Sequence, residues 1–173
     1  MSTGFVSALD RDRDQDTESE DSESEGESEA SAEANGGALI VEDHAPGAGD
    51  GVARFPAQEI VHRSKISCLS WNSHVKNHLL SSDYEGVVSL WDSEVGSLIH
   101  NYNEHEKRAW SVDFSVVDTH TFASGGDDTK VKLWSTQLKN SIATIPTKAN
   151  ICSVRFNPKT ANQIAFGSAG ILK

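Results

Sequence analysis

Short segments in which apolar and polar side chains alternate recur along the second two thirds of the chain. The sequences GVVSLW (residues 86–91) and TKVKLW (residues 129–134) alternate in this way and are rich in β-branched and aromatic residues. Turn clusters rich in Gly, Asp and Ser precede them at residues 82–86 and 125–129. No window combines the period of an amphipathic helix with capping residues. The pattern therefore predicts an all-β fold of short strands.

These strands belong to a longer repeat of the sequence. Three segments superimpose, namely SKISCLSWN (64–72) with HLLSSDYEGVVSLWD (78–92), KRAWSVDFS (107–115) with TFASGGDDTKVKLWS (121–135), and ANICSVRFNP (149–158) with QIAFGSAG (163–170). Trp91 and Trp134 lie 43 residues apart, and a period of this length with a Trp-Asp or Trp-Ser ending is typical of propeller blades. We therefore predict a WD-repeat β-propeller with blades of four strands.

The repeats occupy residues 54–173, with blade one at about residues 60–100, blade two at about 101–145 and part of blade three at about 146–173. Closed propellers have about four to eight blades, so about two and a half blades predict an incomplete propeller with open edges. We interpret the chain either as a real short form or as a truncated version of a longer protein. Both interpretations fit the sequence.

Charge divides the chain at about residue 53. Residues 1–53 hold 15 acidic side chains against two arginines, whereas residues 54–173 hold 11 acidic and 13 basic side chains. The run from Asp10 to Glu33 has almost no apolar side chain to bury, and Gly and Ala are frequent in residues 34–52. We expect residues 1–53 to form a disordered acidic Ser/Glu-rich tail with a Gly/Ala linker.

Three hydroxyl side chains of this tail are candidate phosphorylation sites. Thr17, Ser22 and Ser24 each have a glutamate three residues later, which is the pattern that acid-directed kinases prefer. The alternative is a solvating tail in which these hydroxyl groups have no such role.

The composition argues against several classes of protein. No run of about 18 apolar residues is present, so we expect no membrane span, and the N-terminus lacks the pattern of a secretory signal. Cys68 and Cys152 are too few for a disulfide scaffold or a zinc site, which favours the nucleus and cytoplasm. A net charge of -11 argues against nonspecific nucleic-acid binding. Because we find no catalytic triad, phosphate-binding loop or metal cluster, we expect no cofactor and no enzyme activity in this chain itself.

A buried polar tetrad is expected in the second blade. In such blades an aspartate before the Trp strand bonds a histidine, and a strand serine and the Trp indole complete the network. The residues that fit this pattern are His105, Ser124, Asp128 and Trp134. We expect the first blade to lack the tetrad, because Glu85 takes the aspartate position and no histidine precedes Lys65 at the required distance. The alternative role of His105 is that of a base or a metal ligand.

Several strings are more specific than the general repeat: SKISCLSW, SSDYEGVV, EHEKRAWSVDF, KVKLWS and KANIC. They span about residues 60–173 and resemble the propeller of the constitutive photomorphogenesis ubiquitin ligase, and KVKLWSTQLKNSIATI is most similar to its animal form. The plant suppressor-of-phytochrome-A proteins carry related WD-repeat propellers. In that family the full-length ligase has a RING finger and a coiled coil before the propeller, and we find neither pattern in this sequence.

By the resemblance, short acidic peptides with a Val-Pro pair are received by Lys65, Tyr84, Arg108, Trp110 and Lys148. The repeat places Lys65 and Lys148 at the start of corresponding inner strands, and Arg108 and Trp110 in the same stretch of blade two, so we expect them to cluster at one rim. Trp110 offers a flat apolar face to a proline ring, and the cations suit an acidic flank. The alternatives are solvated rim charges and, for Trp110, packing within the blade.

The resemblance implies a non-catalytic protein-interaction module that acts as the substrate receptor of a RING-type ubiquitin ligase. It would bind acidic Val-Pro degrons of transcription factors or pseudokinase adaptors, which are then ubiquitinated and degraded by the proteasome. No nucleic acid or membrane is implied as a partner. The alternative is a scaffold or regulatory fragment that associates with the full-length ligase without binding substrate itself. The sequence identifies neither the substrates nor the oligomeric state.

Overall fold

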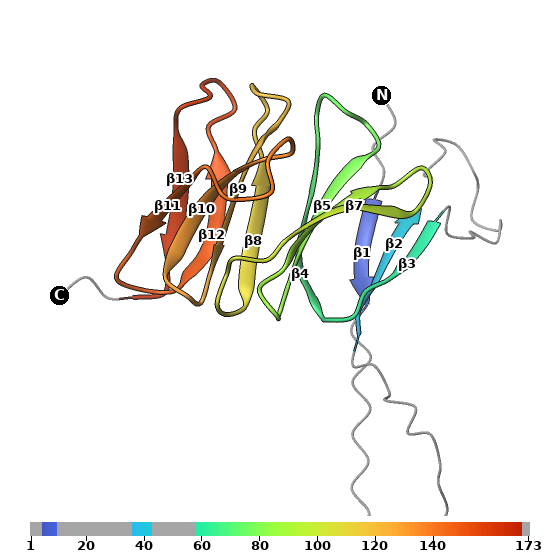
Figure 1. Ribbon diagram of the computed structural model, residues 1–173, viewed down its shortest axis with the longest axis horizontal. Coiled ribbons are helices and arrows are strands. Elements are labelled where there is room, and N and C mark those ends of the chain that lie inside the picture. The colour runs from blue at the N-terminus through green and yellow to red at the C-terminus, as the bar shows by residue number, and fades with distance from the viewer. Residues whose placement is uncertain (1–4, 10–35, 43–57, 171–173) are drawn as a thin grey trace, which may run out of the picture.

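The structure, a computed structural model, describes residues 5–9, 36–42 and 58–170. In these residues it has thirteen strands and no helix, which confirms the predicted all-β fold. The strands form four antiparallel sheets, each made of strands that are consecutive in sequence. The sheets follow one another across the molecule, from β1–β3 at one side to β12 and β13 at the other (Figure 1).

Two of the sheets are four-stranded blades. Blade one consists of β4 (Ile66–Trp71), β5 (His78–Asp83), β6 (Val88–Asp92) and β7 (Ser97–Tyr102). Blade two consists of β8 (Ala109–Phe114), β9 (Thr121–Gly126), β10 (Lys130–Ser135) and β11 (Ala143–Pro146). The first two strands of blade three are β12 (Ile151–Phe156) and β13 (Ile164–Ser168). The strand order confirms the propeller-blade architecture that the repeat predicted.

The inner strands of the three blades pack side by side, with β8 between β4 and β12. Across the first seam the Phe114 N–H donates to Ser70 Oγ at 3.1 Å, and across the second the Phe156 N–H donates to Asp113 Oδ2 at 2.8 Å. Apolar residues also pack across both seams, including Leu80 against the β8 side chains and Ala123 against those of β12. Two kinds of contact therefore hold each blade to the next. One is apolar packing, and the other is a hydrogen bond from a backbone N–H of one blade to a side-chain oxygen of its neighbour.

The turn between β5 and β6 lies directly against the segment that leads into β8. Gly86 has a φ of 86°, and a Cβ at this position would lie 2.5 Å from the Lys107 carbonyl oxygen. Only glycine accommodates both the left-handed backbone and this approach. The turn can therefore bring Tyr84 next to Arg108, which comes from a different blade.

A further sheet precedes blade one and differs from the predicted linker. It consists of β1 (Phe5–Leu9), β2 (Ala38–Glu42) and β3 (Gln58–Val61), so that residues 38–42 are a strand and not a flexible segment. Leu39 is fully buried in a cluster with Ile60, Leu79 and Trp91. The apolar run ALIV suits a strand, and it covers a face of blade one that water would otherwise reach. The remainder of the predicted tail, including Thr17, Ser22 and Ser24, lies outside the described residues.

Candidate functional site

Three of the five predicted peptide-binding residues meet where blades one and two adjoin. Tyr84 follows β5, Arg108 precedes β8 and Trp110 lies in β8. The Arg108 guanidinium carbon is 4.2 Å from the Tyr84 ring centroid and 4.9 Å from the Trp110 ring. The two rings meet edge to face, with centroids 5.4 Å apart and planes at 64°. These three residues, which we call the aromatic–arginine site, thus form a cation flanked by two aromatic rings.

A carboxylate fixes the orientation of the Trp110 ring. The Trp110 Nε1–H donates to Asp127 Oδ1 at 2.7 Å, and Asn150 Nδ2 donates to the same oxygen at 2.9 Å. The Asp127 N–H in turn donates to the Arg108 carbonyl at 2.9 Å. Because Asn150 precedes β12, this one aspartate connects the site to blade three. The sequence analysis missed both Asp127 and Asn150.

The Arg108 side chain is half-buried, and its buried Nε has no hydrogen-bond partner among the described residues. Packing on the two rings compensates for part of the lost hydration of this atom, but it provides no acceptor for its N–H. A ligand carboxylate would pair with the terminal nitrogens of the guanidinium, and not with the buried Nε, in charge-assisted hydrogen bonds.

The two predicted lysines lie in loops at the start of inner strands. The Lys65 carbonyl accepts the Tyr84 N–H at 3.0 Å, which places the Lys65 backbone at the aromatic–arginine site. Lys148 is exposed in the loop between β11 and β12, two residues before Asn150. The structure therefore brings Tyr84, Arg108 and Trp110 into direct contact, and it places the lysines in the loops on either side.

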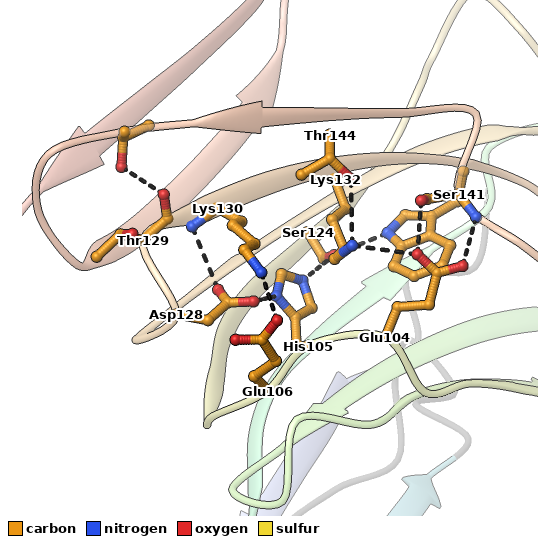
Figure 2. A network of polar contacts seen from close by, with 12 residues as sticks. Glu104, His105, Glu106, Ser124, Asp128, Thr129, Lys130, Lys132, Ser141 and Thr144 are labelled. Atoms are coloured by element: carbon orange, nitrogen blue, oxygen red, sulfur yellow. Dashed lines mark hydrogen bonds and ion pairs between the residues drawn. The ribbon is translucent and has the colours of Figure 1, made fainter.

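The four tetrad residues of blade two meet in one buried network, of which Figure 2 labels His105, Ser124 and Asp128. His105 Nδ1 is 2.8 Å from Asp128 Oδ2, and His105 Nε2 is 2.7 Å from Ser124 Oγ. The Trp134 Nε1–H donates to the same Ser124 hydroxyl at 2.8 Å. Burial lowers the pKa of His105, although the Asp128 carboxylate opposes the effect. Since every polar atom of the ring is engaged, this geometry fits a structural role, and no cluster of three metal-ligating residues occurs among the described residues.

A second buried polar group lies beside the tetrad and was not predicted. Lys132 is almost fully buried, and its Nζ donates to Glu104 Oε2 and Thr144 Oγ1, both at 3.1 Å (Figure 2). The Ser141 N–H donates to the other Glu104 oxygen at 2.9 Å. Burial alone would raise the pKa of Glu104, but the hydrogen bonds from Ser141 and Lys132 outweigh it and lower that pKa. The pair joins the segment before β8 to the outer strands of the blade.

The expectation that no histidine stands at the equivalent position of blade one is wrong. His62 lies 43 residues before His105 and is buried, with its ring centroid 5.7 Å from that of Trp91. Its Nδ1 is 3.9 Å from Asp83 Oδ2, and the Trp91 Nε1–H donates to Ser81 Oγ at 2.9 Å. Because the aspartate stands two positions earlier than in blade two, blade one has a looser version of the same network.

Comparison with known proteins agrees with these features. Residues 56–92 and 96–135 match the family described as WD domain, G-beta repeat, which confirms the predicted WD-repeat fold. This chain is 54% identical over 114 residues to E3 ubiquitin-protein ligase COP1 of Arabidopsis thaliana and 51% identical over 115 residues to Protein SUPPRESSOR OF PHYA-105 1 of the same plant. It is 52% identical over 117 residues to COP1 of Pisum sativum. The resemblance inferred from the sequence is thereby confirmed.

These similarities cover most of this chain but a small part of each relative. The alignments span 66%, 66% and 68% of this chain, and 17%, 11% and 17% of the respective relatives. No helix among the described residues is long and apolar enough to cross a membrane.

Proposed function

We propose that this chain is a peptide-recognition module that receives substrates for a ubiquitin ligase. The observation that carries the proposal is the Arg108 guanidinium, which packs over two adjoining aromatic rings and whose buried Nε has no hydrogen-bond partner among the described residues. The names of two of the relatives, E3 ubiquitin-protein ligases, support the ligase context. In this role the chain contributes recognition, and ubiquitin transfer depends on other parts of the ligase.

The ligand that best fits the aromatic–arginine site is a short acidic peptide with a Val-Pro pair. The rings of Tyr84 and Trp110 offer apolar faces for the proline and valine side chains. A carboxylate of the peptide would then pair with the terminal nitrogens of the Arg108 guanidinium, and the charges of Lys65 and Lys148 would attract the acidic flank during association. We place this recognition in the nucleus and cytoplasm, with transcription factors or pseudokinase adaptors as the sources of the peptide.

Calorimetric titration of such a peptide into the 173-residue chain tests the proposal. We expect Arg108→Gln to weaken binding by about 10-fold or more, because a charge-assisted hydrogen bond in a desolvated site is lost. Arg155→Gln is the matched control, since Arg155 is largely exposed and its NH1 group already donates to Asp113 Oδ1 at 2.8 Å. A peptide in which Ala-Ala replaces Val-Pro should also bind weakly. Equal affinities of the wild type and the Arg108→Gln variant would refute the assignment.

A second candidate function is association with the full-length ligase. The observation that favours it is the exposed sheet of blade three, in which β13 has no neighbour on one edge among the described strands and Phe166 is 43% exposed. Such an edge can pair with a strand of another chain. Co-purification with the full-length ligase that Arg108→Gln leaves unchanged would support this function in place of peptide recognition.

A further inference from the structure

The strand β2 begins close to the aromatic–arginine site. The Gly37 N–H, directly before this strand, donates to the Ser64 carbonyl at 3.2 Å. The following residue, Lys65, accepts the Tyr84 N–H through its own carbonyl, and the Tyr84 ring contacts the Arg108 guanidinium. A short series of direct contacts therefore leads from Gly37 to Arg108.

The strand register brings both ends of the preceding segment to this place. Leu9, the last residue of β1, pairs with Ala38, the first residue of β2, and Ala38 pairs with Val61 of β3. Leu9 and Ala38, which flank residues 10–37 in the sequence, thus both lie at the end of the sheet that adjoins the Ser64–Lys65 segment. This stretch contains 12 acidic side chains and two basic ones.

We propose that the aromatic–arginine site is also a docking surface for the chain's own acidic segment, residues 10–35. The inference rests on the proposed function, because the cation that would bind the carboxylates of a substrate peptide would bind these carboxylates too. Charge complementarity favours this occupant, since Arg108 has no ion pair among the described residues and the segment is strongly anionic. A stretch of this length, at roughly 3.4 Å per extended residue, reaches a site that lies next to its attachment points.

Attachment at both ends makes even weak carboxylate contacts effective. Tethered segments of this kind act at effective concentrations in the millimolar range. The segment contains neither valine nor proline, so it can satisfy the cations but not the aromatic rings. A Val-Pro peptide would therefore displace the segment. Because of this competition, the apparent affinity of the chain for the peptide would be about 3- to 10-fold lower than that of a chain whose segment is neutral.

The experiment compares the 173-residue chain with a variant in which six glutamates of the segment are replaced by glutamine, at positions 18, 20, 23, 25, 27 and 29. The first measurement is the Trp110 indole resonance of the ¹⁵N-labelled chain, identified with Trp110→Phe. The Trp134 indole, which donates to Ser124 within the buried tetrad, is the internal reference. The second measurement is the calorimetric affinity for the acidic Val-Pro peptide at low and high salt.

We expect neutralisation to shift the Trp110 resonance, to leave the Trp134 resonance in place and to tighten peptide binding, with a smaller gain at high salt. In the Arg108→Gln background the shift should disappear. An unchanged Trp110 resonance would overturn the inference, even with tighter peptide binding, because general charge repulsion would then explain the gain. A shifted Trp110 resonance in a chain that binds no Val-Pro peptide would support the inference and refute the proposed function.

Discussion

In the aromatic–arginine site, each residue has a separate part in positioning one cation and the rings beside it. Arg108 supplies the charge, Tyr84 and Trp110 pack against it, and Asp127 holds the indole edge through a 2.7 Å hydrogen bond. The same Asp127 oxygen accepts from Asn150, so the orientation of Trp110 depends on a contact with blade three. Asp127 is therefore a positioning residue, which acts on a peptide through Trp110.

Two substitutions separate the hydrogen-bonding role of Asp127 from its charge. Asp127→Ala removes the acceptor of two hydrogen bonds, and we expect the loose indole to weaken binding of the Val-Pro peptide by about 3- to 10-fold. Asp127→Asn retains an acceptor oxygen and removes a negative charge near the site, so an acidic peptide should bind at least as tightly as to the wild type. Calorimetry and the Trp110 indole resonance provide the measurements. Equal behaviour of the two variants would contradict the positioning role.

Asp127 and Asn150 could not be predicted from the sequence, because their roles depend on contacts that form only in the folded chain. The repeat placed Arg108 and Trp110 at one rim with the two lysines, whereas Tyr84 was a candidate through the family resemblance alone. Asp127 was missed because the Asp-Asp pair at 127–128 has one member in the tetrad, and only the backbone turn shows that the other faces Trp110.

At the scale of elements, the repeat predicted the blades well because the Trp-ending strands and the turns before them recur at a fixed spacing of 43 residues, from Trp91 to Trp134. The strand β2 was not predicted. Its apolar run, ALIV, is short, and it follows a long acidic segment whose composition indicates disorder. Its partner surface, which includes Leu79 and Trp91 of blade one, exists only after the blades have folded. A tertiary contact of this kind leaves little local signal in a sequence.

Truncation of Leu39 tests whether β2 stabilises blade one. Leu39→Ala removes a fully buried side chain from the cluster with Ile60, Leu79 and Trp91, and we expect it to lower the free energy of unfolding by about 2–4 kcal/mol. Ile40→Ala is the control in the same strand, because Ile40 is half-buried and lies outside this cluster, and its loss should be smaller. Urea denaturation followed by tryptophan fluorescence measures both variants. Equal effects would show that β2 contributes no specific packing.

At the scale of the whole molecule, the burial of the sheets falls towards blade three. The inner strand β8 is packed on both sides, whereas four of the five residues of β13 are exposed. Phe166 is 43% exposed on this strand, and β13 has an unpaired edge among the described strands. An open sheet edge with an exposed aromatic side chain favours association between chains.

We therefore expect the 173-residue chain to self-associate. Size-exclusion chromatography with light scattering should give masses above the 18.7 kDa of a single chain, and these masses should increase with protein concentration. Phe166→Lys, which places a charge on the exposed sheet, should reduce association without changing the packed seams. A monodisperse single chain with one sharp thermal transition would contradict this expectation.

The hydrogen bonds across the two seams also determine the symmetry that such association can have. In each seam a side-chain acceptor of the earlier blade, Ser70 or Asp113, binds a backbone N–H of the later one, Phe114 or Phe156. Hydroxyl groups of the earlier blade also donate to carbonyls of the later one, Ser67 to Ala109 and Ser111 to Val154. The two faces of a blade are consequently unlike, because one contributes side chains and the other contributes backbone groups. A two-fold axis would place identical faces against each other, so it cannot reproduce a seam. Copies that reuse this packing must join head to tail, which generates a ring or an open-ended row and not a closed two-fold dimer.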